Sequence, residues 1–165
     1  MSNPRSILIV EDEPLIAMML EDFLDSMGHN VVGTCDTLKD CLEWADRGGF
    51  DVAIIDVNLK GGENVWPLAD KLAESGIPFV VATGGHVEPP PAQHADAPVL
   101  SKPYTIDAIE PAIEQAIAGQ GSRADASAQP AIAALAIQGR PKPTRRVAHD
   151  ADRNMHVMAD VVASN

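Results

Sequence analysis

Short continuous runs of apolar residues recur along the first two thirds of the chain. In the segments between these runs, the apolar residues are separated by polar ones. Three nearly continuous runs span residues 7–10, 52–55 and 79–82, and two shorter ones span 31–32 and 99–100. Continuous apolar runs are typical of parallel strands that have helices over both faces. The pattern therefore predicts five buried parallel strands.

The segments between these strands show apolar residues at helical spacing. Pro14 stands at a typical first helical position, and the pattern that follows it ends at Gly28. Similar patterns end before Gly48 and before Gly76, and the last one covers residues 106–117. The alternation predicts an α/β fold of the (βα)5 type, a doubly wound parallel sheet with right-handed crossovers.

Two segments do not fit a regular helix. Residues 86–97 (HVEPPPAQHADA) occupy the place of the fourth helix, but three consecutive prolines remove amide donors and clash with the preceding turn. We expect the fourth helix to be shortened or replaced by a loop with at most one helical turn. Pro111 lies inside the last helix, where an interior proline costs about 3 kcal/mol, so that helix is expected to be kinked or to begin later.

The composition changes after Gly119, toward Ala, Ser, Gln, Pro and Arg. We expect a domain over residues 1–119 and a low-complexity, flexible tail over 120–165. Residues 1–120 carry 20 Asp and Glu against 6 Lys and Arg, a formal charge of −14, whereas the remainder carries +2. So acidic a surface repels nucleic acid and anionic lipid, which argues against direct nucleic-acid binding by the first 120 residues.

The cysteines and the lengths of the apolar runs indicate the cellular compartment in which the protein is expected. Cys35 and Cys41 form no CxxC pair and have no His neighbours at metal-ligand spacing, so we expect two reduced thiols in a cytosolic fold. The longest late apolar run, 131–137, is shorter than the roughly 18 residues that a membrane span requires. A cytoplasmic protein without membrane attachment is expected.

Unusual polar residues follow four of the five predicted strands. Glu11 and Asp12 follow the first strand, Asp56 the third, Thr83 the fourth and Lys102 the fifth. Ligands of open α/β sheets collect beyond the carboxyl ends of the strands, so these side chains are candidates for one site.

Three carboxylates that converge in one pocket repel each other, so they share protons or hold a cation. Oxygen ligands without His or Cys suit a hard ion such as Mg²⁺, which keeps some waters and is completed by phosphate oxygens. We therefore interpret the charge at the end of the first strand as a metal site that allows a phosphoryl group to approach.

Four motifs in this order and spacing, ILIVEDEP, AIIDVNLKGGE, VVATGG and VLSKPY, resemble the receiver domain of two-component response regulators, the CheY-like superfamily. The resemblance covers residues 6 to about 118. It implies a flavodoxin-like fold with strand order 2-1-3-4-5, an order for which receivers are themselves a known example. It also implies a cis peptide between Lys102 and Pro103, although trans is the commoner isomer in general.

The resemblance also implies roles for individual residues. Asp56 would be the phosphoacceptor, Thr83 would meet the phosphoryl oxygens, and Lys102 would pair with the phosphoryl group. The ligands of Mg²⁺ would be Glu11, Asp12, Asp56 and the backbone carbonyl of Asn58.

Three features depart from the usual receiver. Val99 occupies the position where many receivers carry a switch aromatic, and Tyr104 is a speculative substitute. The proline-interrupted fourth helix, together with PFVVATGG at 78–85, is similar to a receiver subgroup named for its Phe-x-x-Ala-Thr-Gly motif and linked to bacterial stress signalling. No output domain is recognisable.

The expected function is a single-domain response regulator that takes a phosphoryl group from a histidine kinase or phosphotransfer protein and signals through a downstream protein target. It is expected to be a switch rather than an enzyme, and a monomer or weak homodimer. A phosphate shuttle or sink, and a receiver-like binding module that is never phosphorylated, stay open. A phosphatase with an aspartate nucleophile is less favoured, because Asn58 replaces the general acid and base of such enzymes. Dinucleotide binding is weaker still, since no GxGxxG follows the first strand.

Overall fold

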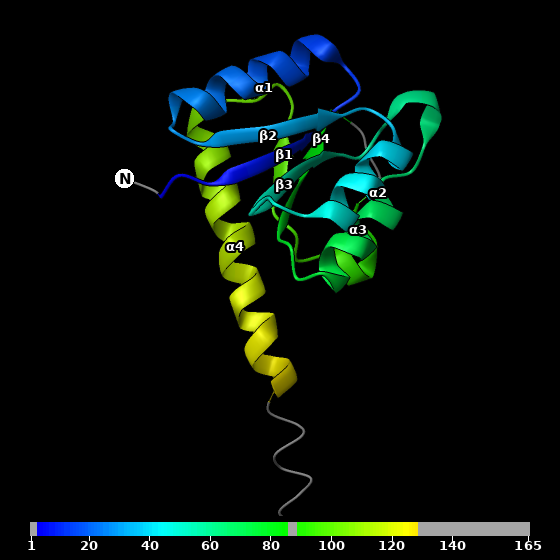
Figure 1. The fold of residues 1–165 in the computed structure, drawn as a ribbon, viewed down its shortest axis with the longest axis vertical. Helices are drawn as coiled ribbons and strands as arrows, with labels where there is room; N and C mark the ends of the chain where they lie inside the picture. The colour runs from blue at the N-terminus through cyan, green and yellow to red at the C-terminus, as the bar shows by residue number, and fades with distance from the viewer. Residues whose placement is uncertain (1–2, 86–88, 129–165) are drawn as a thin grey trace, which may run out of the picture.

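The computed structural model describes residues 3–85 and 89–128. Within them, five parallel strands form one sheet in the order β2-β1-β3-β4-β5 (Figure 1). The bounds are β1 Ser6–Val10, β2 Asn30–Cys35, β3 Val52–Asp56, β4 Phe79–Thr83 and β5 Val99–Ser101. The predicted strands, their order and the flavodoxin-like fold are confirmed.

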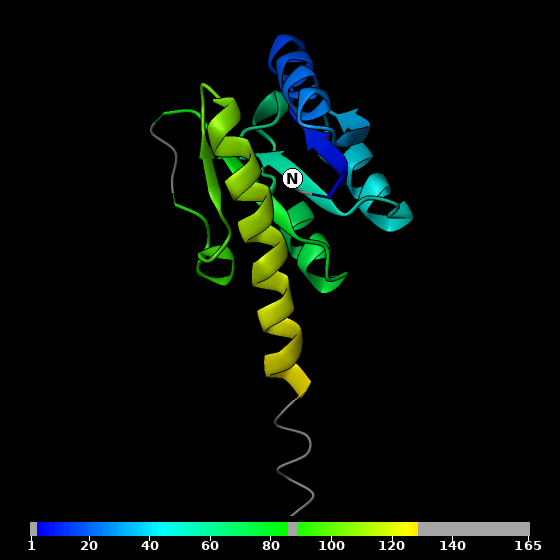
Figure 2. The same ribbon diagram turned by 90° about the vertical axis from the view of Figure 1, so that its left-hand side faces the viewer.

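Helices cover both faces of the sheet, as the doubly wound fold requires. Helices α1 and α4 lie over one face and α2 and α3 over the other, an arrangement that Figures 1 and 2 both show. The bounds are α1 Pro14–Ser26, α2 Leu38–Arg47, α3 Trp66–Glu74 and α4 Ile106–Ala128, with 3₁₀ turns at η1 Lys60–Gly62 and η2 Ala92–His94.

Alternate residues of β1, β3 and β4 belong to different cores. Along β1, Ile7 and Ile9 face the α1 and α4 side, whereas Leu8 and Val10 face the α2 and α3 side. All four side chains are buried, which explains why the strand is apolar at every position rather than at every second one. Because all neighbouring strands are parallel, their carboxyl ends lie at one common edge of the sheet.

A loop replaces the fourth helix, as expected from its prolines. Of residues 89–97, only Ala92–His94 form a helical turn. The His94 side chain is buried, and its Nε2 lies 2.7 Å from Oδ1 of Asp70 on α3. Its ring stacks on Trp66 at 6.0 Å between centroids and meets the edge of Phe79 at 5.4 Å. One histidine therefore fastens this loop to α3 and to the sheet.

The last helix begins before its proline rather than after it. Helix α4 starts at Ile106 and contains Pro111, so a later start is excluded. It continues to Ala128, beyond the domain boundary predicted at residue 119, and its end projects away from the sheet (Figures 1 and 2). Residues 129–165, most of the predicted tail, lie outside the described residues. In the described part, no helix has the length and apolarity that crossing a bilayer requires.

The prediction of two reduced thiols is wrong in this structure, because Cys35 and Cys41 form a disulfide. Cys35 ends β2 and Cys41 lies in α2, and the turn between the two elements brings their Cα atoms to 5.6 Å. That separation lies in the usual range for a disulfide. Spacing in the sequence alone did not reveal the pair, because their proximity depends on how the chain turns from strand to helix.

We expect Gly33→Ala to destabilise the fold by about 1–3 kcal/mol, the usual cost of forcing extra atoms into a packed site. A Cβ at Gly33 would overlap the indole of Trp44, lying only 2.8 Å from its Cη2. Urea unfolding measures the change. The matched control is Gly119→Ala on α4, where a Cβ meets nothing within 4 Å and alanine should stabilise the helix by about 0.5–1 kcal/mol. Equal effects at both positions would contradict the steric argument.

We expect Asp70→Asn to speed amide hydrogen exchange at residues 92–97, because it weakens the hydrogen bond to His94. That bond, and a second one from Gln93, lower the pKa of Asp70 below its ordinary value of 3.8. The contribution to stability is therefore present above pH 3.8 and is lost as pH falls through the lowered pKa.

The effect of Asp70→Asn on global stability should stay below about 1 kcal/mol, because the carboxylate is half-exposed to solvent. The control is Asp46→Asn, which weakens a 2.6 Å ion pair with Lys71 between α2 and α3 and does not involve the loop. Faster exchange at 92–97 in both variants would show that the loop is not held through His94.

Candidate functional site

Three carboxylates meet where β1 and β3 end. The two strands are paired in register up to Val10 and Ile55, so the residues that follow lie side by side. One carboxylate oxygen from each of Glu11, Asp12 and Asp56 lies within 4.8 Å of the others. The parallel sheet therefore brings together the three acids that the sequence places at strand ends.

The ammonium of Lys102 lies against this acid cluster. Its Nζ is 2.6 Å from Oε2 of Glu11 and 2.7 Å from Oδ2 of Asp56. The residue follows β5, and its backbone N–H donates to the carbonyl of Thr83 at 2.7 Å. The Lys102–Pro103 peptide is cis, as the resemblance implies. The side chain thus crosses from the edge strand to the centre of the sheet.

Burial and neighbouring charges both shift the pKa values of Glu11 and Lys102. Desolvation raises the pKa of Glu11, which is 2% exposed, although the hydrogen bond from Lys102 acts in the opposite direction. Burial alone would lower the pKa of Lys102, but its hydrogen bonds to Asp56 and Glu11 outweigh that effect and raise it. The lysine is therefore a firmly charged ammonium.

A hard divalent ion fits this donor set. Three carboxyl groups converge here and a single ammonium contacts two of them, a donor arrangement that a divalent cation would balance. All the donors are oxygens, the ligand type that Mg²⁺ prefers. The residues that could hold such an ion are Glu11, Asp12 and Asp56.

Asn58 and Thr83 lie beside the acid cluster with different contacts. The backbone N–H of Asn58 donates to Oδ1 of Asp56 at 3.1 Å, so the loop after β3 already holds the second oxygen of that carboxylate. Thr83 ends β4 and is half-buried, and its carbonyl is the acceptor for Lys102. The metal contact of the Asn58 carbonyl and the phosphoryl contact of the Thr83 hydroxyl stay predictions.

One neighbour of the cluster was not predicted from the sequence. Tyr104 is only 5% exposed, and its hydroxyl lies 3.4 Å from Oε2 of Glu11. Val99, at the usual switch-aromatic position, is by contrast 51% exposed. In the sequence, Tyr104 directly follows Lys102 and Pro103, which could have indicated that it lies near the site. That position did not show that its hydroxyl points to Glu11.

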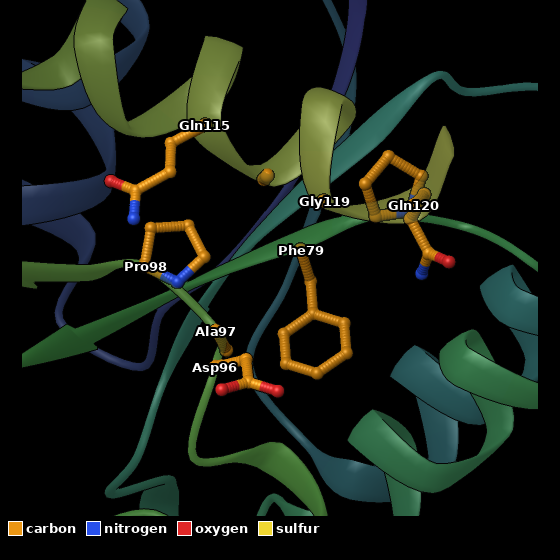
Figure 3. A pocket seen from close by; sticks show the side chains of 9 residues that line it. Phe79, Asp96, Ala97, Pro98, Gln115, Gly119 and Gln120 are labelled. Atoms are coloured by element: carbon orange, nitrogen blue, oxygen red, sulfur yellow. The ribbon is translucent and has the colours of Figure 1, made fainter. Parts of the chain in front are cut away.

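A separate cavity of about 250 Å³ lies at the other end of the sheet (Figure 3). Phe79 begins β4 and Pro98 precedes β5, so this hollow is at the opposite end of the strands from Asp56. Gln115 and Gln120 of α4 also line it. Its lining is apolar and amide apart from the carboxylate of Asp96, and it lacks the three convergent carboxylates of the acid cluster, so the phosphoryl chemistry is not assigned to it.

Comparison with known proteins identifies the family. The model of the response regulator receiver domain matches residues 7–114, and the chain belongs to this family. Receiver domains bind Mg²⁺ at an acidic pocket, and this chain has a cluster of three acidic residues, Glu11, Asp12 and Asp56. The family is that of the receivers of two-component signalling.

This chain matches individual relatives over different shares of their lengths. SdrG from Sphingomonas melonis Fr1 is 50% identical over 71% of this chain and 99% of that one, with a TM-score of 0.64. Transcriptional regulatory protein PdtaR of Mycobacterium tuberculosis is 30% identical over 69% of this chain and 57% of its own length. Phyllosphere-induced regulator PhyR of Methylorubrum extorquens is 33% identical over 70% of this chain and 45% of its own length. The chain thus spans about half the length of the curated relatives it matches.

We expect Mg²⁺ to raise the melting temperature of the protein, because an ion that binds only the folded state stabilises it. At 100 times its dissociation constant, the gain is about 2.7 kcal/mol. Glu11→Gln removes one charged ligand and should abolish most of the gain, as measured by thermal unfolding with and without Mg²⁺ at constant ionic strength. Glu74→Gln, an exposed acid at the end of α3, is the control and should keep the full gain. An equal loss in both variants would mean that the ion acts on net charge rather than at the acid cluster.

Proposed function

We propose that the chain accepts a phosphoryl group on Asp56, with Mg²⁺ bound at the acid cluster, in the manner of a single-domain response regulator of a two-component phosphorelay. The observation that carries the proposal is the position of Lys102. Its ammonium contacts Asp56 and Glu11 at once, so it stands beside the carboxylate that would attack phosphorus. The donor would be a phosphohistidine of a histidine kinase or phosphotransfer protein.

The chain's own residues would share the work of the transfer. An oxygen of Asp56 would form a bond to phosphorus while the bond from phosphorus to the donor nitrogen breaks and the electron pair leaves with that nitrogen. Lys102 would neutralise charge on the transferred oxygens, and Mg²⁺ held by Glu11, Asp12 and Asp56 would supply further neutralisation. The N–H of Asn58 would keep the Asp56 carboxylate oriented.

The product would persist as an acyl phosphate rather than turn over rapidly. An aspartate-nucleophile phosphatase needs a general acid and base two residues after the nucleophile, and Asn58 at that position cannot exchange a proton. Thr83, at the end of β4, would gain a phosphoryl partner only in the phosphorylated state. A contact that exists in one state alone shifts the balance between two conformations.

Two similar proteins support the proposed phosphorylation and the proposed action through protein contacts. One solved structure is that of the BeF₃-activated conformation of SdrG from Pseudomonas melonis Fr1, which is 51% identical to this chain. Another is of PhyR from Bartonella quintana, described as an anti-anti-sigma factor. We propose that this chain likewise acts in the cytoplasm through protein contacts, using the face formed by β5, α4 and the described loop residues 89–97.

The decisive experiment is intact mass spectrometry after incubation with Mg²⁺ and a small phosphodonor such as acetyl phosphate. We expect one phosphoryl adduct, which disappears in Asp56→Asn and when the metal is chelated. The matched control is Asp51→Asn, which changes an exposed aspartate just before β3 and should leave the adduct in place.

The other outcomes separate the competing functions. Steady release of inorganic phosphate from unrelated phosphoesters would instead identify a phosphatase. Absence of an adduct in the wild-type protein, with small donors and with a phosphorylated histidine kinase, would leave only a binding module. Rapid return of the phosphoryl group to a phosphotransfer protein would favour a shuttle over a switch.

A further inference from the structure

Tyr104 is the only tyrosine of the chain, and it lies two residues beyond Lys102. Its ring belongs to the core between the sheet and helices α1 and α4. Its hydroxyl is directed at the acid cluster, at 3.4 Å from Oε2 of Glu11. The ring is therefore anchored in the core while its polar end reaches the site.

The hydroxyl shares its acceptor with the lysine. Oε2 of Glu11 is also the oxygen that Lys102 Nζ contacts at 2.6 Å, whereas Oε1 accepts the backbone N–H of Glu13 at 3.1 Å. A hydroxyl to carboxylate distance of 3.4 Å is long for a hydrogen bond, as expected when a closer ammonium already occupies the oxygen. The contact can tighten if that ammonium leaves.

The proposed phosphorylation requires the ammonium to leave. Lys102 now bridges Glu11 and Asp56, and pairing with a phosphoryl group on Asp56 draws it away from Glu11. An ammonium also repels a divalent cation that shares the same carboxylate. The Tyr104 hydroxyl offers a hydrogen bond without positive charge, so it can stay on the carboxylate when the ion binds.

We propose that Tyr104 is a positioning residue: its hydroxyl takes over Oε2 of Glu11 when Lys102, repelled by bound Mg²⁺ and then paired with the phosphoryl group, leaves that oxygen, and so keeps Glu11 facing the metal. The inference rests on the proposed function of the acid cluster. The geometry that carries it is one carboxylate oxygen shared by a charged donor that must move and a neutral donor that is fixed in the core. Asp56 has no such second side-chain donor in the described structure, since its other contact is the N–H of Asn58.

Tyr104→Phe tests the proposal because it removes the hydroxyl and keeps the ring. We expect the Mg²⁺ dissociation constant, measured by calorimetry, to rise about 3- to 10-fold, the range for losing one modest hydrogen bond to a charged group. The Mg²⁺ concentration for half-maximal phosphorylation by acetyl phosphate should rise by the same factor, while the rate at saturating Mg²⁺ stays within about twofold.

The matched control is Thr34→Val, which removes another hydroxyl to carboxylate hydrogen bond, 2.7 Å to Glu21, on the exposed surface at the β2 edge. It should leave both Mg²⁺ curves unchanged. Superimposable curves for the wild-type protein and Tyr104→Phe would overturn the proposal. Equal loss of rate at every Mg²⁺ concentration, together with a lower melting temperature without metal, would also overturn it, because the tyrosine would then serve packing alone.

A second measurement uses the fact that the chain has one tyrosine. Uniform labelling with 3-fluorotyrosine gives a single ¹⁹F resonance, which reports Tyr104 in the otherwise intact protein. We expect it to shift on phosphorylation in the presence of Mg²⁺, and an unmoved resonance would count against the proposal. A wild-type protein that binds no Mg²⁺ and accepts no phosphoryl group would overturn the proposed function as well, whereas an active protein insensitive to Tyr104→Phe overturns this inference alone.

Discussion

The interaction on which the structure of the site depends is the balance of three carboxylates against one ammonium. Glu11 and Asp56 are almost fully buried, and each is held by Lys102 at less than 3 Å. Without this cation the desolvated acids would repel each other at the edge of the sheet. With it, the cluster still carries excess negative charge, which suits a divalent ion and then a phosphoryl group.

The fold and most of the site could be predicted because both follow from simple rules. Apolar runs without alternation indicate strands covered on both faces, and parallel strands end at one edge, so acids after β1 and β3 must meet. The Cys35–Cys41 pair and the contact between Tyr104 and Glu11 could not be predicted in this way. Both depend on the direction that a side chain takes after a turn, which neither periodicity nor spacing encodes.

The same distinction explains why the loop in place of the fourth helix could be predicted but its attachment could not. Consecutive prolines exclude a helix, and the structure has a single turn at Ala92–His94. The fastening of that turn through a buried histidine between Trp66 and Phe79 was not predictable, because nothing in the sequence around His94 distinguishes a buried ring from an exposed one. The prolines thus exclude the fourth helix, and the packing of His94 determines how the loop that replaces it is held.

This replacement changes how the β5 side of the molecule can respond to events at Asp56. A helix packed along its length can slide or rotate by small steps, because many contacts adjust together. The segment at 89–97 has instead a single 3₁₀ turn, held to α3 by Gln93 and His94, which both bond to Asp70, and by the ring contacts of His94. Movement of this segment away from α3 therefore requires the buried His94 ring to leave its place between Trp66 and Phe79.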